Sequence, residues 1–484
     1  MEIVALNYQV FMLSYQHNGL KKYYGDCYME LYRFRSCDKL LGDKYKELEE
    51  QYFYFAPPSD QNDPMEGKIE FYWQGDKIAW FGLLKNYVWQ LFLTIVYVPA
   101  YKNIDEMEEF NFFVAGFAWK DSHYAESRTR LERNTINAPT LQKFVDAIVA
   151  ADKKIEAASL QYLLTLIHPV AIDIVTHELV LIKYYDIDPQ KTGAIFQRNN
   201  PVIEDNFTSY LQEKEKLQKD SLSWLLFLQQ AKLIIPQNLQ DATKKLAIQK
   251  RTFVQYEYPC AYIQKLQQKL CFANWYFTCF NTAIQNPATW AYYADSHKGV
   301  GLIFDTETDF CFDFKEHKNV KLDLTQVAYD KTTISRNFFE SIGEVAGSEI
   351  SHWFYIDKEV SAVWNKVQKN ANAWHNQYWD DQKRSLSRKG EFWKHEEEYR
   401  ILLSDMEKEL TENSDRKLHY KFNILKGIVF GIRTPFEDKK KIVDILNRKC
   451  KENNQKNFPV YQAQYDKSGN YIEKVLFMTL PYDE

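Results

Sequence analysis

The sequence lacks the short motifs that mark the common metal and nucleotide enzymes. Its seven cysteines form no CxxC or CxxH pair, and HExxH is absent, so neither a zinc site nor a disulfide framework is expected. It has no glycine-rich phosphate loop and no serine nucleophile elbow. Its Gly-x-Gly, at Gly299 and Gly301, opens a strand-like run rather than a helix. The dinucleotide-binding fingerprint is therefore not met.

The chain also lacks a strong charge of one sign. With 61 basic and 66 acidic residues its formal charge is −5, so no overall positive charge indicates a nucleic-acid-binding protein. Nucleic acid is kept only as one alternative target of the protein's activity. The N-terminus has no basic region or cleavage site of a signal peptide. Of two apolar runs, Tyr87–Ala100 is too short to span a bilayer, and Ser159–Tyr185 is interrupted by polar residues such as Asp173. We expect a soluble cytoplasmic protein with no membrane partner.

The 484 residues are too many for one compact core and divide by pattern into three parts. Strand-like segments with turn residues fill 1–121 and return in 256–484, whereas 122–255 shows helical periodicity broken by prolines. We expect an α+β fold whose mixed or antiparallel split sheet is formed by the N- and C-terminal parts. The segment 122–255 would be a large helical insertion that binds a protein partner or a second copy of the chain.

Among the extended segments we predict Tyr32–Arg35, Gly67–Tyr72 and Ile78–Phe81 near the start, and Glu398–Ser404 near the end. The most informative stretch runs from Cys279 to Asp305. It predicts a strand, a turn, an aromatic helix with Trp290, Tyr293 and His297 on one face, and a buried strand from Val300. Gly299 would end the helix through a left-handed residue. Such an aromatic stripe is more often core than ligand site.

Three other groups could carry chemistry. Tyr32, Arg33 and Arg35 alternate on a predicted strand, and an arginine fork suits either pyrophosphate or structural salt bridges. Asn62 and Asp63 lie in a turn before Pro64, where backbone capping by Asp63 is the stronger interpretation and a ligand contact the weaker.

The third group is the acidic triplet at residues 396–398. If Glu398 opens a strand, Glu396 and Glu398 point to one side and Glu397 to the other. The pair could act as a general base or accept a hydrogen bond from a sugar hydroxyl. The alternative is a solvated acidic turn.

Four blocks in order resemble an uncharacterised bacterial family, the domain of unknown function 2971 family. They are the YRFR strand at 32–35, NDPME at 62–66, WAYYADSHKG at 290–299 and WKHEEEYR at 393–400. The chain departs from the family pattern at Gln61, where Phe is usual, at Tyr292, where His is usual, and at Arg33-Phe34, where Lys-Tyr is common. The family name itself implies no activity.

At the level of roles, the chain is similar to ADP-ribosyltransferases and their toxin relatives. These place a basic residue on an early strand, a hydroxyl residue in the middle and Glu-x-Glu at a late strand. The resemblance implies an NAD-dependent effector in phage defence or a toxin system. Its catalytic residues would be Glu398, Glu396 and Tyr293. Its cofactor-binding residues would be Tyr32, Arg33, Arg35, Trp290, Asn62 and Asp63.

Two alternatives remain open. Asp63, Glu66, Glu396 and Glu398 could hold magnesium in a nuclease or other hydrolase, although such sites rarely stack Trp and Tyr nearby. The chain could also be a non-catalytic ligand-sensing or partner-binding scaffold.

Overall fold

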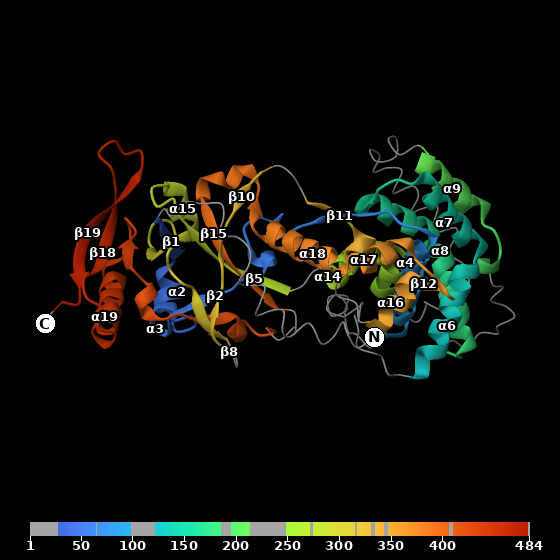
Figure 1. The fold of residues 1–484 in the computed structure, drawn as a ribbon, viewed down its shortest axis with the longest axis horizontal. Coiled ribbons are helices and arrows are strands. Elements are labelled where there is room, and N and C mark those ends of the chain that lie inside the picture. The colour runs from blue at the N-terminus through green and yellow to red at the C-terminus, as the bar shows by residue number, and fades with distance from the viewer. Residues whose placement is uncertain are drawn as a thin grey trace. The chain divides into compact units, whose positions relative to one another are not determined.

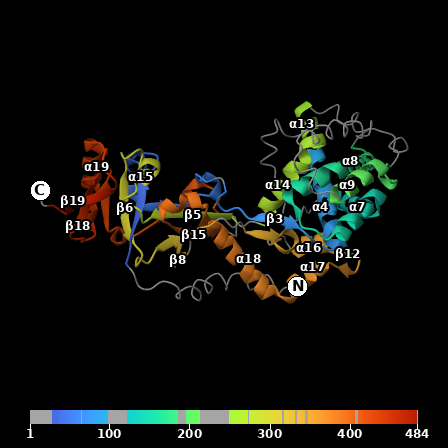
Figure 2. The same ribbon diagram turned by 90° about the horizontal axis from the view of Figure 1, so that it is seen from above.

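The computed structural model describes residues 28–97, 122–184, 195–212 and 248–482, with short gaps at 64, 272–273, 315–316, 331–333, 343–346 and 406–409. These residues belong to two compact units (Figures 1 and 2). Unit 1 comprises Met1–Lys68, Ala273–Thr332 and Asp381–Glu484, and unit 2 comprises Ile69–Phe272 and Thr333–Asp380.

Unit 1 is built on an eight-stranded sheet in the order β19-β18-β17-β6-β1-β5-β15-β9. Strands β17 and β18 pair in parallel and the other neighbours pair antiparallel, so the sheet is mixed. The N-terminal strand lies between strands from the later part of the chain, which confirms the expected α+β fold with a sheet shared by the two parts. The strands are β1 (Glu30–Arg35), β5 (Asn274–Asn281), β6 (Val300–Asp305), β9 (Leu324–Gln326), β15 (Glu398–Asp405), β17 (Gly427–Phe430), β18 (Phe458–Tyr465) and β19 (Ile472–Leu480).

Each face of this sheet is covered by a different helix. Helix α19 (Phe436–Glu452) packs its apolar residues with Leu302 and Phe430 in the larger core of unit 1, and we call this side the α19 face. Helix α15 (Pro287–Tyr293) packs Trp290 against Phe34 and Ile303 on the opposite side, the α15 face. Because side chains alternate along a strand, each strand residue is assigned to one of these faces.

Helix α15 ends earlier than the sequence predicts. Its last residue is Tyr293, and residues 295–297 have positive φ values of 45°, 53° and 70°, so His297 does not continue the aromatic face. The role expected of Gly299 is also wrong. A Cβ there would lie 2.2 Å from the Arg35 carbonyl oxygen, so glycine is needed for close approach to β1 rather than for a left-handed helix end.

Unit 2 is mainly helical. Its longer helices are α4 (Lys77–Tyr97), α6 (Ser122–Asn137), α7 (Pro139–Ala151), α8 (Ala157–Leu181), α9 (Pro201–Gln212), α14 (Tyr258–Leu270), α16 (Gly347–Phe354) and α17 (Ala362–Lys369). A small sheet joins β11 (Ser335–Asn337), β3 (Glu70–Trp73) and β4 (Ile155–Glu156). Helix α18 (Ala371–Leu386) is divided between the units after Asp380.

The helical unit is larger than the insertion expected at 122–255. It comprises two separate segments of the chain, Ile69–Phe272 and Thr333–Asp380. The main error lies at Ile78–Phe81, which belongs to α4 and is not extended. A short apolar run does not distinguish a buried strand from a buried helix. Of the segment expected to be helical, 122–255, residues 185–194 and 213–247 lie outside the described residues.

Helix α8 is the one helix in the described ranges that is long and apolar enough to cross a membrane. Its most apolar window has a mean hydropathy of 1.5, and 94% of that window is buried inside the protein. Such burial is typical of the core helix of a soluble protein.

The remaining elements of unit 1 are short. They are α2 (Cys37–Leu41), α3 (Glu47–Glu50), β2 (Tyr52–Tyr54), η2 (Pro58–Asp60), β7 (Cys311–Phe314), β8 (His317–Lys321), β10 (Ala328–Tyr329), β14 (Arg388–Lys389), η8 (Glu391–Glu396), η9 (Asn413–Arg416), β16 (Lys417–His419) and η10 (Phe422–Ile424).

Candidate functional site

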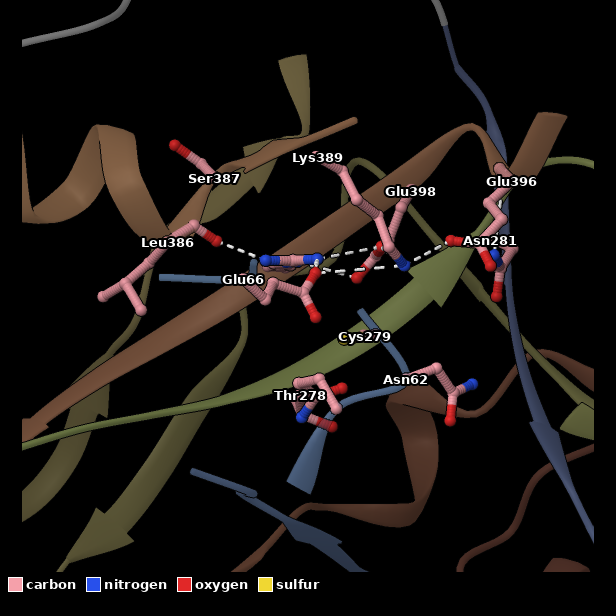
Figure 3. Close-up of polar contacts among 12 residues, drawn as sticks. Asn62, Glu66, Thr278, Cys279, Asn281, Leu386, Ser387, Lys389, Glu396 and Glu398 are labelled. Atoms are coloured by element: carbon pink, nitrogen blue, oxygen red, sulfur yellow. Dashed lines mark hydrogen bonds and ion pairs between the residues drawn. The ribbon is translucent and has the colours of Figure 1, made fainter. Parts of the chain in front are cut away.

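Arg400 is the centre of a buried ionic cluster on the α15 face of unit 1. Figure 3 shows three other members of the cluster, Glu66, Lys389 and Glu398, close together. The side chain of Arg400 is 0% exposed and projects from β15 over the ring of Phe277. The guanidinium donates from Nε to Glu398 Oε1 at 2.7 Å and from Nη2 to Glu398 Oε2 at 3.0 Å. It also donates to Glu66 Oε1 and to the Leu386 carbonyl. The planar fork thus links β15 to the turn around Glu66.

Lys389 brings a third carboxylate into the same cluster. Its ammonium lies 2.6 Å from Glu396 Oε2, 3.2 Å from Glu398 Oε2 and 3.9 Å from Glu66 Oε1. The Trp393 ring covers the ammonium, with its centroid 4.7 Å from Nζ. We call Glu66, Lys389, Glu396, Glu398 and Arg400 the ionic cluster.

The cluster has a side that leads toward solvent. The Tyr293 hydroxyl donates to Glu396 Oε1 at 2.5 Å, and Asn62 Nδ2 lies 3.5 Å from the same hydroxyl. Tyr293 is half-buried and Asn62 is exposed, whereas the side chain of Glu396 is only 1% exposed. Phe392, which precedes Trp393, is 93% exposed. The ionic cluster therefore meets the surface beside aromatic side chains.

The acidic triplet places its carboxylates as expected, although the backbone differs from a continuous strand. Glu396 ends the 3₁₀ helix η8, Glu397 takes a left-handed conformation with φ of 46°, and Glu398 opens β15. This turn directs Glu396 and Glu398 to one ammonium and leaves Glu397 exposed, where its carboxylate accepts from Thr282 Oγ1 at 2.9 Å. The side chain of Asn281 fixes the turn by donating to the Glu396 carbonyl at 3.1 Å.

The carboxylates of the cluster differ in pKa. Burial raises the pKa of Glu398, but Arg400 and Lys389 outweigh it and lower this pKa to about 2. Burial also raises the pKa of Glu66, and there the attraction of Arg400 and Lys389 does not overcome it. The difference follows from contact geometry, because Glu398 binds cations through both oxygens, whereas Glu66 Oε2 has no hydrogen-bond partner in the described residues.

Burial and the charges of the cluster also shift the pKa values of Lys389, Tyr293 and Cys279. Burial lowers the pKa of Lys389, but the three carboxylates reverse this and raise it. The pKa of Tyr293 is raised by burial and then by Glu396, so its hydroxyl stays protonated and acts as a donor. Burial and Glu398 raise the pKa of the Cys279 thiol in the same way, which makes it a poor nucleophile.

The cluster carries more negative than positive charge. With Glu66 ionised, three carboxylates face one ammonium and one guanidinium, which leaves a formal charge of −1. Burying such groups costs several kcal/mol per ion before pairing offsets it. Strongly shifted pKa values in a group of this kind are characteristic of functional sites as well as of structural ion networks.

The structure separates the predicted cofactor residues. Tyr32 pairs with Asn281 and lies on the α15 face, but its hydroxyl donates to Glu30 and accepts from Lys474 at 3.0 Å. Arg33 and Arg35 lie on the α19 face, because they alternate with Tyr32, so they do not reach the ionic cluster. The shared site expected for these arginines and Glu398 is therefore wrong.

Two further predicted contacts are structural. Trp290 is 0% exposed, packs edge-on against Phe34 and donates to the Ile284 carbonyl, so it offers no face to a ligand. Asp63 is buried and its carboxylate accepts from the Met65 amide at 2.9 Å, in agreement with the capping interpretation.

Sequence reasoning missed Lys389 as a site residue and gave no paired role to Arg400. Lys389 is one of many lysines in the chain, and nothing in its neighbours signals that it is buried. Arg400 does carry a signal, because it stands two residues after Glu398 on the same face of a strand.

Most of the carboxylates suggested as magnesium ligands are already paired with cations of the protein. Glu66, Glu396 and Glu398 converge, but around Lys389 and Arg400, and Asp63 caps a turn. The described ranges contain no group of three or more His, Cys, Asp or Glu side chains arranged for a metal ion.

Comparison with known proteins adds no identification. No family model, no curated protein and no solved structure matches the chain.

Proposed function

We propose that unit 1 is a cytoplasmic ADP-ribosyltransferase-like enzyme that breaks the glycosidic bond between nicotinamide and ribose in NAD. The observation that supports this proposal is the excess negative charge of the ionic cluster beside Tyr293 and Trp393. Cleavage of that bond develops positive charge at the anomeric carbon, and fixed negative charge stabilises such a transition state.

Glu396 is the carboxylate proposed to act on the ribose. Its Oε1 accepts from Tyr293, which leads to exposed Asn62, and its Oε2 accepts from Lys389. Glu398 is instead bound through both oxygens to the buried Arg400. Glu398, Lys389 and Arg400 would hold the charge and orientation of Glu396. This exchanges the roles that the sequence suggests for the two glutamates.

The reaction balances without a redox partner. The bond between C1′ and the pyridinium nitrogen breaks, and its electron pair leaves with nicotinamide, which becomes neutral. An oxygen or nitrogen of the acceptor bonds to C1′ and loses a proton. Trp393 is the aromatic residue proposed to stack with the cationic nicotinamide ring, in place of buried Trp290.

The biological setting is proposed from the resemblance alone. An NAD-consuming enzyme of this kind would act as an effector in phage defence or a toxin system. Unit 2 would bind a protein partner or a second copy of the chain.

The test is nicotinamide release from NAD by the purified chain and its variants. Glu396→Gln keeps size but removes charge, and we expect release to fall by roughly a hundredfold or more. Glu397→Gln makes the same chemical change at the exposed neighbour and should be nearly silent. Thermal melting of both variants separates lost chemistry from lost folding. Equal losses of nicotinamide release in the two variants would reject the proposal. It would also be rejected if the unmodified chain released no nicotinamide from NAD when cell lysate is added as a source of acceptors.

A second candidate is a non-catalytic sensor, because both oxygens of Glu396 and of Glu398 are already engaged. Calorimetric binding of NAD without nicotinamide release would favour it.

A further inference from the structure

Arg33 is a buried arginine without an ion pair. It is 4% exposed and lies on the α19 face of the sheet, with its guanidinium carbon 5.2 Å from the centre of the Phe53 ring. It donates to Thr278 Oγ1 and, at 3.3 Å, to the Cys279 carbonyl. In the described ranges no carboxylate bonds to it, and its Nε has no hydrogen-bond partner although that atom is buried.

Other cations lie close to Arg33. Arg35 is the next residue on the same face, and its Nε lies 2.7 Å from Glu47 Oε2. Lys39, on helix α2, is within electrostatic range of both arginines. Three cations thus share the carboxylate of Glu47, and Asp38, the nearby acidic residue on α2, is exposed.

The pKa values of two of these cations, Arg33 and Lys39, are lowered. The pKa of Arg33 is lowered to about 9, first by burial and then by Arg35, with Glu47 acting in the opposite direction. At neutral pH Arg33 remains charged. The pKa of Lys39 is likewise lowered, first by the partial burial of its side chain and then by Arg35. For both groups the strongest electrostatic neighbour is therefore a cation.

A buried charge without a partner is costly, and an arginine fork with an unpartnered Nε is suited to a tetrahedral oxyanion. We propose that Arg33, Arg35 and Lys39 form a binding site for a phosphate group, either free or carried by a nucleotide. Exposure increases from Arg33, through Arg35 with 16% of its side chain exposed, to exposed Lys39, so solvent reaches the group of cations at Lys39.

This site is independent of the proposed NAD reaction, because the sheet separates it from the ionic cluster. Tyr32, which precedes Arg33 in β1, points to the α15 face with Asn281 and Glu398, whereas Arg33 and Arg35 point to the α19 face. Loss of nicotinamide release would leave this proposal unaffected, and loss of phosphate binding would leave the NAD reaction unaffected.

The experiment is isothermal titration of the full chain with inorganic phosphate, and separately with ADP, against sodium chloride of equal ionic strength. We expect phosphate to bind, Arg33→Met to weaken binding at least tenfold, and Arg33→Lys to weaken it less because the charge is kept. Lys467→Met removes one exposed charge in the β18–β19 turn and should change nothing. Tighter binding of ADP than of phosphate would identify a nucleotide as the ligand.

If Arg33→Met does not fold, a substitution of exposed Lys39 tests the same proposal. Lys39→Met should weaken phosphate binding several-fold while the melting temperature in chloride stays unchanged. Absence of phosphate binding by the unmodified chain, or equal binding by the Lys39→Met and Lys467→Met variants, would overturn the proposal. Arg33 would then be a structural arginine whose replacement by Met raises stability in phosphate and chloride alike.

Discussion

Tyr32 and Glu398 both pair with Asn281, Tyr32 from β1 and Glu398 from β15, so residues from the two ends of the chain lie on either side of one β5 residue. The pairing places both side chains on the same face of the sheet. It also explains why the arginines beside Tyr32 fall on the other face. This register fixes the faces on which Tyr32, Arg33, Arg35, Glu398 and Arg400 lie.

Lys389→Met should destabilise unit 1 strongly. It would leave Glu66, Glu396 and Glu398 with Arg400 as the remaining cation of the ionic cluster, and an uncompensated buried charge costs about 3–5 kcal/mol. Lys394→Met, an exposed substitution in η8, is the matched control and should cost little. Urea unfolding monitored by hydrogen exchange in β15 measures both. A Lys389→Met protein as stable as the control would contradict the electrostatic role of the cluster.

Glu398 should make unit 1 sensitive to acid. Its pKa is lowered to about 2 from an ordinary value of 4.5, so its contribution to stability is complete above pH 4.5 and is lost as the pH falls toward 2. In Glu398→Gln this loss should be absent, although the variant is less stable at neutral pH. The comparison requires hydrogen exchange in β15 at pH 5 and pH 3. Parallel pH profiles for the two proteins would show that Glu398 does not titrate as described.

Gly299→Ala should disrupt the contact between β1 and the segment before β6. The added Cβ would lie 2.2 Å from the Arg35 carbonyl oxygen, which is backbone and cannot rotate away. We expect a loss of about 3 kcal/mol or more. Gly469→Ala is the control, because a Cβ there meets nothing within 4 Å and the cost arises only from its φ of 73°, at about 1 kcal/mol. Equal melting temperatures for the two variants would contradict this account of Gly299.

His168 should make unit 2 sensitive to mild acid. Its Nε2 lies 2.8 Å from the Val254 carbonyl and must carry the proton, so Nδ1 accepts from the Tyr87 hydroxyl at 2.7 Å. Burial lowers the pKa of His168 to about 4, so the neutral ring stabilises the fold above pH 6.5 and this stability, about 3 kcal/mol, is lost as the pH falls toward 4.

The corresponding measurement is hydrogen exchange of α8 amides at pH 7 and pH 4.5. His168→Gln should remove most of the difference between the two pH values after correction for intrinsic exchange. Tyr87→Phe should keep it, because the imidazole still titrates. An α8 that is equally protected at both pH values in the unmodified chain would show that His168 is not the sensitive group.

The sequence by itself determined the local pattern of the sheet. Alternation identified β1 and β15 as strands, and the unbroken apolar run marked β6 as buried on both faces. The relation between Glu396 and Glu398 was also predicted, although the left-handed backbone at Glu397 was not.

Tertiary structure alone decided which segments meet. Lys389 and Glu66 become site residues only because a turn from the early chain and β14 approach β15 in space, and no local signal specifies such contacts. The same holds for the opposite faces of Arg33 and Glu398, because relative orientation depends on the strand order β1-β5-β15 and its register. Local periodicity follows from backbone geometry, whereas strand order and ion pairing arise from burial of surfaces that are distant in the chain.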